Sequence, residues 1–101
     1  MDTAAFSIGQ VVHHTMFEYR GVIYDVDAMF AGSEEWYEQV ARSRPPRNKP
    51  WYRVLVDGQN MQTYVAEPHL EAEPDANPVD HPLIKRLFSR FEDGSYVMPY
   101  S

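Results

Sequence analysis

The sequence predicts a mainly β protein: a small, strongly bent barrel of about five antiparallel strands, with one inserted helix and one C-terminal helix. Two observations predict it. Short β-rich runs alternate with turn signals over residues 6–70, and two apolar stripes at helical spacing interrupt and follow them. About five short strands are too few for a sandwich, so an SH3-like barrel is the architecture that suits them.

Length and composition predict one domain over residues 1–101. Hydrophobic residues make up 44% and charged residues 24%, which is typical of a globular domain and not of a disordered chain. No apolar run is long enough to span a membrane, and we see no secretory signal. Cysteine is absent, which excludes disulfides, thiolate metal sites and cysteine nucleophiles. The net charge of −6 disfavours a dedicated non-specific nucleic-acid binder.

Residues 6–32 are predicted to form a hairpin. Its first strand lies within residues 10–14. Its second strand covers residues 21–27, where Val22, Tyr24 and Val26 alternate with Ile23, Asp25 and Asp27.

A helix is predicted to follow at residues 33–44. Ser33 suits the N-cap, and Glu34 and Glu35 suit the positive end of the helix. One apolar stripe is formed by Trp36, Tyr37, Val40 and Ala41. Pro45 ends the helix.

A second hairpin is predicted from residues 51–56 and 61–66, because Asp57-Gly58 between them is a strong turn signal. Residues 71–82 hold three prolines and four acidic side chains, which predicts an extended, solvated connector. A C-terminal helix and tail are expected over residues 83–98, with Gly94 ending the helix.

Four blocks of the sequence resemble a known family. They are residues 6–14 (FSIGQVVHH), 19–27 (YRGVIYDVD), 49–56 (KPWYRVLV) and 63–67 (TYVAE), the last followed by His69-Leu70. Together with a weaker block from His81 to Tyr96, they resemble the HspQ heat-shock proteins, also called the YccV-like or hemimethylated-DNA-binding domain. Two positions depart from the usual pattern: Arg53 stands in place of histidine, and Pro68-His69 in place of Glu-Asn or Gln-Asn.

The resemblance implies an SH3-like barrel in a bacterial cytoplasm and two associated activities. One is promoting the degradation of denatured or selected proteins, including the replication initiator DnaA, with Lon protease. The other is binding hemimethylated DNA and thereby modulating expression of the initiator. We predict the first role, a non-enzymatic accessory of proteolysis whose partners are Lon and its clients. The alternative is a hemimethylated-DNA-binding regulator. Self-association is also expected, because a small barrel exposes edge strands.

A partner-binding surface is predicted on the barrel, because aromatic side chains on such folds form grooves for peptides or modified bases. The candidate residues are Tyr19, Trp51, Tyr52, Arg53, Tyr64 and Glu67. Plain packing is the alternative for the aromatic members. Trp51 and Tyr52 are neighbours on a strand, so we expect one to face inward and the other outward.

One local basic cluster could contact phosphates. It consists of Arg42, Arg44, Arg47 and Lys49. The same residues could instead complement the negative end of the preceding helix and remain solvated. The acidic connector would oppose DNA nearby.

Catalytic and metal sites are not predicted, and no cofactor is expected. Asp25 and Asp27 share a strand face and could form an acid–base pair, but a solvated strand face explains them more simply. The four histidines lack metal-ligand spacing: they are His13, His14, His69 and His81. Gly-rich phosphate loops and nucleophile elbows are absent from the sequence. The protein is therefore predicted not to be an enzyme.

Overall fold

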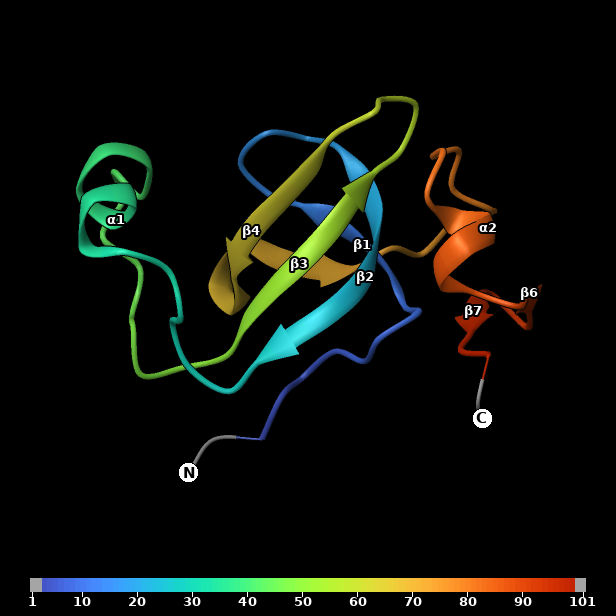
Figure 1. The fold of residues 1–101 in the computed structure, drawn as a ribbon, viewed down its shortest axis with the longest axis horizontal. Helices are drawn as coiled ribbons and strands as arrows, with labels where there is room; N and C mark the ends of the chain where they lie inside the picture. The colour runs from blue at the N-terminus through green and yellow to red at the C-terminus, as the bar shows by residue number, and fades with distance from the viewer. Residues whose placement is uncertain (1–2, 100–101) are drawn as a thin grey trace.

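The computed structural model describes residues 3–99 and consists mainly of one antiparallel sheet (Figure 1). Its strands are β1 (Val11–His14), β2 (Arg20–Asp27), β3 (Trp51–Val56), β4 (Gln62–Ala66) and β5 (Leu70–Ala72). They are ordered β4-β3-β2-β1-β5. The prediction of a mainly β fold with five antiparallel strands is confirmed. No closed barrel is found among the described strands, because β4 and β5 remain the two edges of the sheet.

Turn chemistry explains both hairpins of the sheet. In the β3–β4 hairpin, Gly58 has φ +80°, a conformation that favours glycine, and the Val56 amide donates to the Met61 carbonyl at 3.0 Å. In the β1–β2 hairpin, His13 is paired with Arg20 across a longer loop. Both hairpins therefore form where the sequence predicts them.

A β-bulge bends the long strand β2. The register between β2 and β3 shifts between Ile23 and Asp25, and such bulges increase local twist. The bent sheet folds over a buried cluster to which β1, β3, β4 and β5 each contribute; examples are Val12, Val54, Val65 and Leu70. The sheet thus packs against itself without closing.

Helix α1 (Glu34–Val40) packs outside the sheet. Ser33 is the N-cap as predicted, and its hydroxyl accepts the Trp36 amide at 3.0 Å. The prediction of a helix to residue 44 is wrong, because Ala41 leaves helical geometry and Arg44 has φ +55°. Only part of the predicted stripe is buried: Tyr37 and Ala41 pack on Trp51, whereas Val40 is 57% exposed.

The C-terminal part differs from the predicted helix and tail over residues 83–98. It holds a four-residue helix, α2 (Ile84–Leu87), followed by a hairpin of β6 (Arg90–Glu92) and β7 (Ser95–Val97). The turn at Asp93-Gly94 has positive φ at both residues, which suits a hairpin rather than a helix end. Phe88 and Tyr96 from this part cover Val11, Val22 and Leu55 of the sheet.

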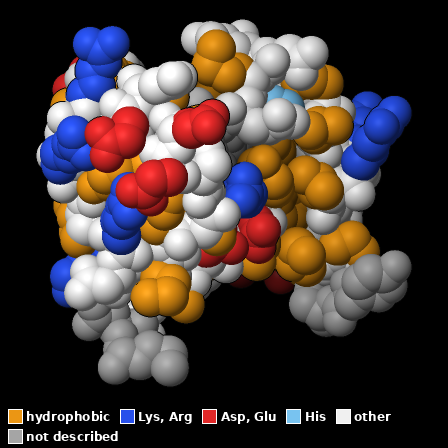
Figure 2. All heavy atoms as spheres, turned by 60° about the vertical axis from the view of Figure 1, so that its left-hand side comes forward, with side chains coloured by type: hydrophobic (Ala, Val, Ile, Leu, Met, Phe, Trp, Pro, Cys, Tyr) orange, Lys and Arg blue, Asp and Glu red, His pale blue; other side chains and the backbone are white. Residues whose placement is uncertain are grey.

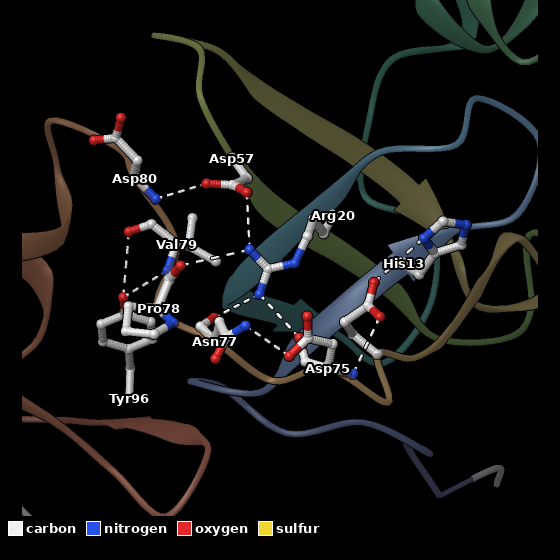
Figure 3. A network of polar contacts seen from close by, with 10 residues as sticks. His13, Arg20, Asp57, Asp75, Asn77, Pro78, Val79, Asp80 and Tyr96 are labelled. Atoms are coloured by element: carbon white, nitrogen blue, oxygen red, sulfur yellow. Dashed lines mark hydrogen bonds and ion pairs between the residues drawn. The ribbon is translucent and has the colours of Figure 1, made fainter.

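The acidic connector is anchored to the sheet, contrary to the expectation that it is solvated. β5 takes up its first residues, and Val79 and His81 are buried. Arg20 lies at the centre of the anchor (Figure 3): its guanidinium donates to the Asp57 carboxylate at 2.8 Å and to three connector carbonyls. These carbonyls belong to Asp75, Asn77 and Pro78. The Tyr96 hydroxyl also accepts the Val79 amide at 2.8 Å.

We predict that Arg20→Met lowers the free energy of unfolding by about 2 kcal/mol, because the connector carbonyls and Asp57 lose a charged donor. Urea denaturation would measure the change. The control is Arg90→Met, which removes an exposed ion pair to Glu92 and is expected to cost under about 0.5 kcal/mol. Equal losses in the two variants would contradict a clamping role for Arg20.

Candidate functional site

An apolar groove runs between helix α1, the β1–β2 loop and strand β4. It consists of two adjoining hollows with volumes of about 180 and 660 Å³. The side chains that line both hollows are His14, Phe17, Trp36, Val40, Tyr64 and Val65. Figure 2 shows hydrophobic side chains gathered in a hollowed part of this face, beside a region crowded with charged groups. We call this feature the groove.

Large apolar side chains in the groove are unusually exposed. Met16 is 53% exposed, Phe17 71%, Val40 57% and Met61 48%. All four line one or both hollows. Contiguous exposed apolar surface of this kind marks interaction sites on soluble proteins. The groove is therefore the best candidate for a partner-binding surface.

The floor of the groove consists of aromatic rings that pack on one another and are fixed by hydrogen bonds. The ring centroids of Trp51 and Tyr64 lie 5.1 Å apart, and Trp36 meets Tyr64 edge-on at 5.7 Å. The Tyr64 hydroxyl donates to the Asp27 carboxylate at 2.6 Å and accepts the Ala31 amide at 3.0 Å. Burial, with the hydrogen bond to Asp27, raises the pKa of Tyr64 to about 12. A ring held by two hydrogen bonds at its hydroxyl and by two neighbouring indoles provides a preorganised surface for an apolar ligand.

Arg53 lies beside the groove and neutralises the two strand carboxylates. Its guanidinium lies 4.5 Å from the centre of the Tyr64 ring, 3.7 Å from Asp25 and 3.6 Å from Asp27. The alternative of an acid–base pair thus has a plainer explanation, since both aspartates balance the charge of Arg53.

Tyr52 and Glu67 lie away from the groove. The Tyr52 side chain is buried, and its hydroxyl donates to Glu67, which also accepts the Ala5 amide at 2.9 Å. Burial and this hydrogen bond raise the pKa of Tyr52 to about 12. The expectation that one of Trp51 and Tyr52 faces outward is wrong. Both are buried because α1 covers one face of β3 and the bent sheet covers the other.

The predicted partner-binding residues therefore divide into two groups. Tyr19, Arg53 and Tyr64 line the groove, and Trp51 contributes to its buried floor. The Tyr19 hydroxyl lies 2.7 Å from the Thr63 hydroxyl, and this contact joins the β1–β2 loop to β4 beside the groove. Tyr52 and Glu67 instead fix the N-terminal segment to the sheet.

The sequence of this chain also matches a known protein family. Residues 4–95 match the model of the family described as hemimethylated DNA-binding protein YccV like. The chain belongs to the YccV-like family. Members of this family are generally non-catalytic. The resemblance stated from the sequence is thereby confirmed.

The basic cluster of this YccV-like domain is largely engaged with helix α1. Arg44 pairs with Glu38 at 2.8 Å, and Arg47 pairs with Glu34 at the same distance. The Arg47 guanidinium also lies 3.9 Å from the centre of the Tyr37 ring. Arg42 alone among the four predicted phosphate contacts lines the groove. Arginines paired with carboxylates contribute less counterion release than unpaired ones, and phosphate contact by this cluster stays a prediction.

Sequence reasoning missed the β1–β2 loop and the C-terminal end of α1. Met16 and Phe17 form one wall of the groove, and Val40 belongs to the other. A signal was present: two adjacent large apolar residues lie in a predicted loop between strands, where burial is not expected.

His14 fixes the loop that carries this wall. Its ring is buried and stacks on Phe17 at 4.8 Å. Its Nδ1 accepts the amides of Met16 and Phe17 at 3.2 and 3.1 Å. Burial, and then the nearby His69 and His13, lower the pKa of His14 below its usual value of 6.5. The neutral ring therefore belongs to the folded state.

We predict that the stability of this YccV-like domain falls on acidification. The folded-state pKa of His14 is depressed, so below pH 6.5 this residue binds more protons in the unfolded chain than in the folded chain. The free energy of unfolding should decrease by up to about 1.4 kcal/mol per pH unit, until the folded-state pKa is passed. Urea denaturation at pH 7.5, 6.5 and 5.5 would measure it. His14→Gln is expected to flatten the dependence, and an unchanged slope would contradict the prediction.

The remaining histidines have structural contacts. His13 lies 3.0 Å from Glu18 and 3.4 Å from Glu73, and His81 bridges the Met61 carbonyl and the Leu83 amide. Within residues 3–99, no three or more side chains of the metal-ligating types are grouped to hold an ion. No helix in the same range has the length and apolar character needed to cross a membrane.

Proposed function

We propose that this YccV-like protein is a non-enzymatic accessory of Lon protease that binds denatured or selected client proteins in the groove. One observation carries the proposal: four large apolar side chains line a preformed groove and are 48–71% exposed. Exposed apolar segments are what distinguishes a denatured client from a folded protein. A groove of this kind suits such segments.

Binding alone is sufficient for this function. An accessory that holds a client and also contacts the protease raises the effective concentration of the client at the protease. The groove needs no acid, base or nucleophile for this purpose. The charged groups beside it serve this role by holding the aromatic floor in place, as Asp27 holds Tyr64.

A reconstituted degradation assay tests the proposal. Purified Lon, ATP and a denatured client are incubated with and without this protein, and the remaining client is followed over time. We expect the half-life of the client to shorten about threefold or more, through the increase in effective concentration. A folded client without exposed apolar segments is the control, and its half-life should not change. An unchanged half-life of the denatured client would overturn the proposal.

Binding of hemimethylated DNA is the second candidate, and the family description favours it. Arg42 beside an aromatic floor could contact a phosphate while a base stacks in the groove. Fluorescence anisotropy with unmethylated, hemimethylated and fully methylated duplexes, at two salt concentrations, would test it. Tighter binding of the hemimethylated duplex at both concentrations would support this function. Equal binding that disappears at moderate salt would exclude it.

A further inference from the structure

The outer edge of β4 presents backbone groups that the sheet does not use. In the β3–β4 ladder, Val56 bonds Met61 and the Glu67 amide donates to Pro50 at 3.1 Å. Hydrogen-bonded and non-hydrogen-bonded pairs alternate along an antiparallel ladder. The N–H and C=O groups of Gln62 and Tyr64 therefore point away from β3. Within the described residues, no backbone or side-chain group bonds them.

The groove runs along this same edge. Its lining includes Met61, Gln62, Thr63, Tyr64 and Val65 without a gap. Successive side chains of a strand point to opposite faces of the sheet, so a hollow lined by consecutive residues reaches the edge of β4. Tyr24 and Arg53 of the inner strands β2 and β3 extend the same hollow over one face of the sheet. The open backbone groups of β4 and the apolar walls of the groove are thus parts of one surface.

The lining of the groove holds no carboxylate among the described residues, although the protein is acidic. The chain has 15 acidic and nine basic residues. Among the described residues, those lining the two hollows include Arg42, Arg53, His14 and His69 but no aspartate or glutamate. Arg53 is balanced by two aspartates, which leaves Arg42 as the cation that best complements a carboxylate on a ligand.

We propose that the groove binds an extended peptide segment by strand addition to β4, with apolar side chains against its walls and a carboxylate beside Arg42. The proposal rests on the proposed function and names the form in which a client is held. An extended backbone is required because only a strand matches the outward groups of Gln62 and Tyr64. The side chains of that strand alternate between the two walls of the groove, to which Phe17 and Val40 belong.

Peptide binding tests the strand pairing directly. The probe is a capped eight-residue peptide with valine or leucine at alternate positions and one aspartate near its end. Two derivatives carry N-methyl groups on alternate backbone amides. One is methylated at the odd-numbered positions and the other at the even-numbered positions, and we call these two sets of amides the two phases. In strand addition only one phase of amides pairs with β4, so we expect one derivative to bind about fivefold more weakly for each hydrogen bond lost, and the other to bind nearly unchanged. Equal affinities of the two derivatives would overturn the proposal.

Variants of the protein test the outward amide of Gln62 and the contact between Arg42 and the carboxylate of the peptide. Gln62→Pro removes one outward amide without touching the β3–β4 ladder, and proline is tolerated at such edge positions. This substitution should lower the affinity for the unmethylated peptide about fivefold. Arg42→Ala should weaken the aspartate peptide about threefold and leave a peptide with asparagine in its place unaffected. Arg90→Ala, on β6 outside the groove, is the control. The N-methyl comparison does not depend on whether Gln62→Pro folds.

The outcomes separate this proposal from the function on which it rests. Phase-dependent peptide binding together with no effect on Lon would support the strand-edge site and overturn the proposed function. Stimulation of Lon with no phase dependence would leave the proposed function standing and overturn strand addition. Sedimentation that shows dimers dissociated by Gln62→Pro, with no peptide binding, would assign the β4 edge to a second copy of the chain and overturn the proposal.

Discussion

Replacing Gly9 by alanine is expected to lower the free energy of unfolding by about 4 kcal/mol, since it combines backbone strain with a severe clash. Gly9 has φ +92°, and a Cβ atom at this position would lie 2.0 Å from the Tyr96 carbonyl oxygen. The Gly9 carbonyl also accepts the Tyr96 amide at 2.8 Å. Alanine would therefore push β7 away from the sheet and expose the cluster around Val11 and Leu55. Urea denaturation would measure the loss.

Gly58→Ala is the matched control for this prediction. Gly58 also has a positive φ of +80°, but nothing lies within 4 Å of its added Cβ atom. Its substitution is expected to cost only about 1 kcal/mol, from the backbone conformation alone. If the two alanine variants lost equal stability, the close approach of Gly9 to β7 would not be a determinant of the fold.

The double variant Met16→Ser, Phe17→Ser is expected to lose nearly all stimulation of client degradation by Lon. Both side chains are more than half exposed, so their removal should change the free energy of unfolding by only about 0.5 kcal/mol. They form one wall of the groove, and apolar contacts of this size are worth about tenfold in affinity each. The degradation assay with a denatured client would measure the effect, and far-UV circular dichroism would confirm the fold.

A matched control removes exposed apolar surface from elsewhere. Ile8 is 37% exposed and Met29 57% exposed, and neither lines the groove. Ile8→Ser, Met29→Ser should leave the stimulation of Lon unchanged. A loss of stimulation as large as that of the groove variant would show that total hydrophobicity, and not the groove, sets the activity.

Local signals predicted most of the regular structure. The β-rich run of residues 51–56 coincides with β3, and the Asp57-Gly58 turn places β4 next to it. Ser33 begins α1 because its hydroxyl accepts an amide three residues along, an interaction decided within one turn. Such features depend on neighbouring residues only, so they are readable in the sequence.

Elements whose ends depend on distant packing were predicted less well. The apolar stripe after residue 83 suits a helix, yet the chain forms α2 and a hairpin. Phe88 and Tyr96 are buried there against Val11, Val22 and Leu55 of the sheet. The free energy gained by burying these side chains outweighs the helix propensity of the segment, and no local sequence pattern predicts such burial.

The candidate site was predicted in part. Tyr19, Arg53 and Tyr64 were expected at a binding surface and line the groove, whereas Tyr52 and Glu67 do not. Alternation along a strand assumes one solvated face. That assumption fails for β3, which is covered on both faces. Alternation therefore could not predict that Trp51 and Tyr52 are both buried.

The sequence by itself determined the family, the five-stranded antiparallel character and the β1–β2 and β3–β4 hairpins, since ordered residue blocks and local turn chemistry specify them. Only the tertiary structure decided which charged side chains form ion pairs and which apolar surfaces remain exposed. The partners of Arg20, Arg44 and Arg47 became known only when loops and helix α1 were placed against the sheet. The groove arises from the same placement, because its walls come from three segments far apart in the chain.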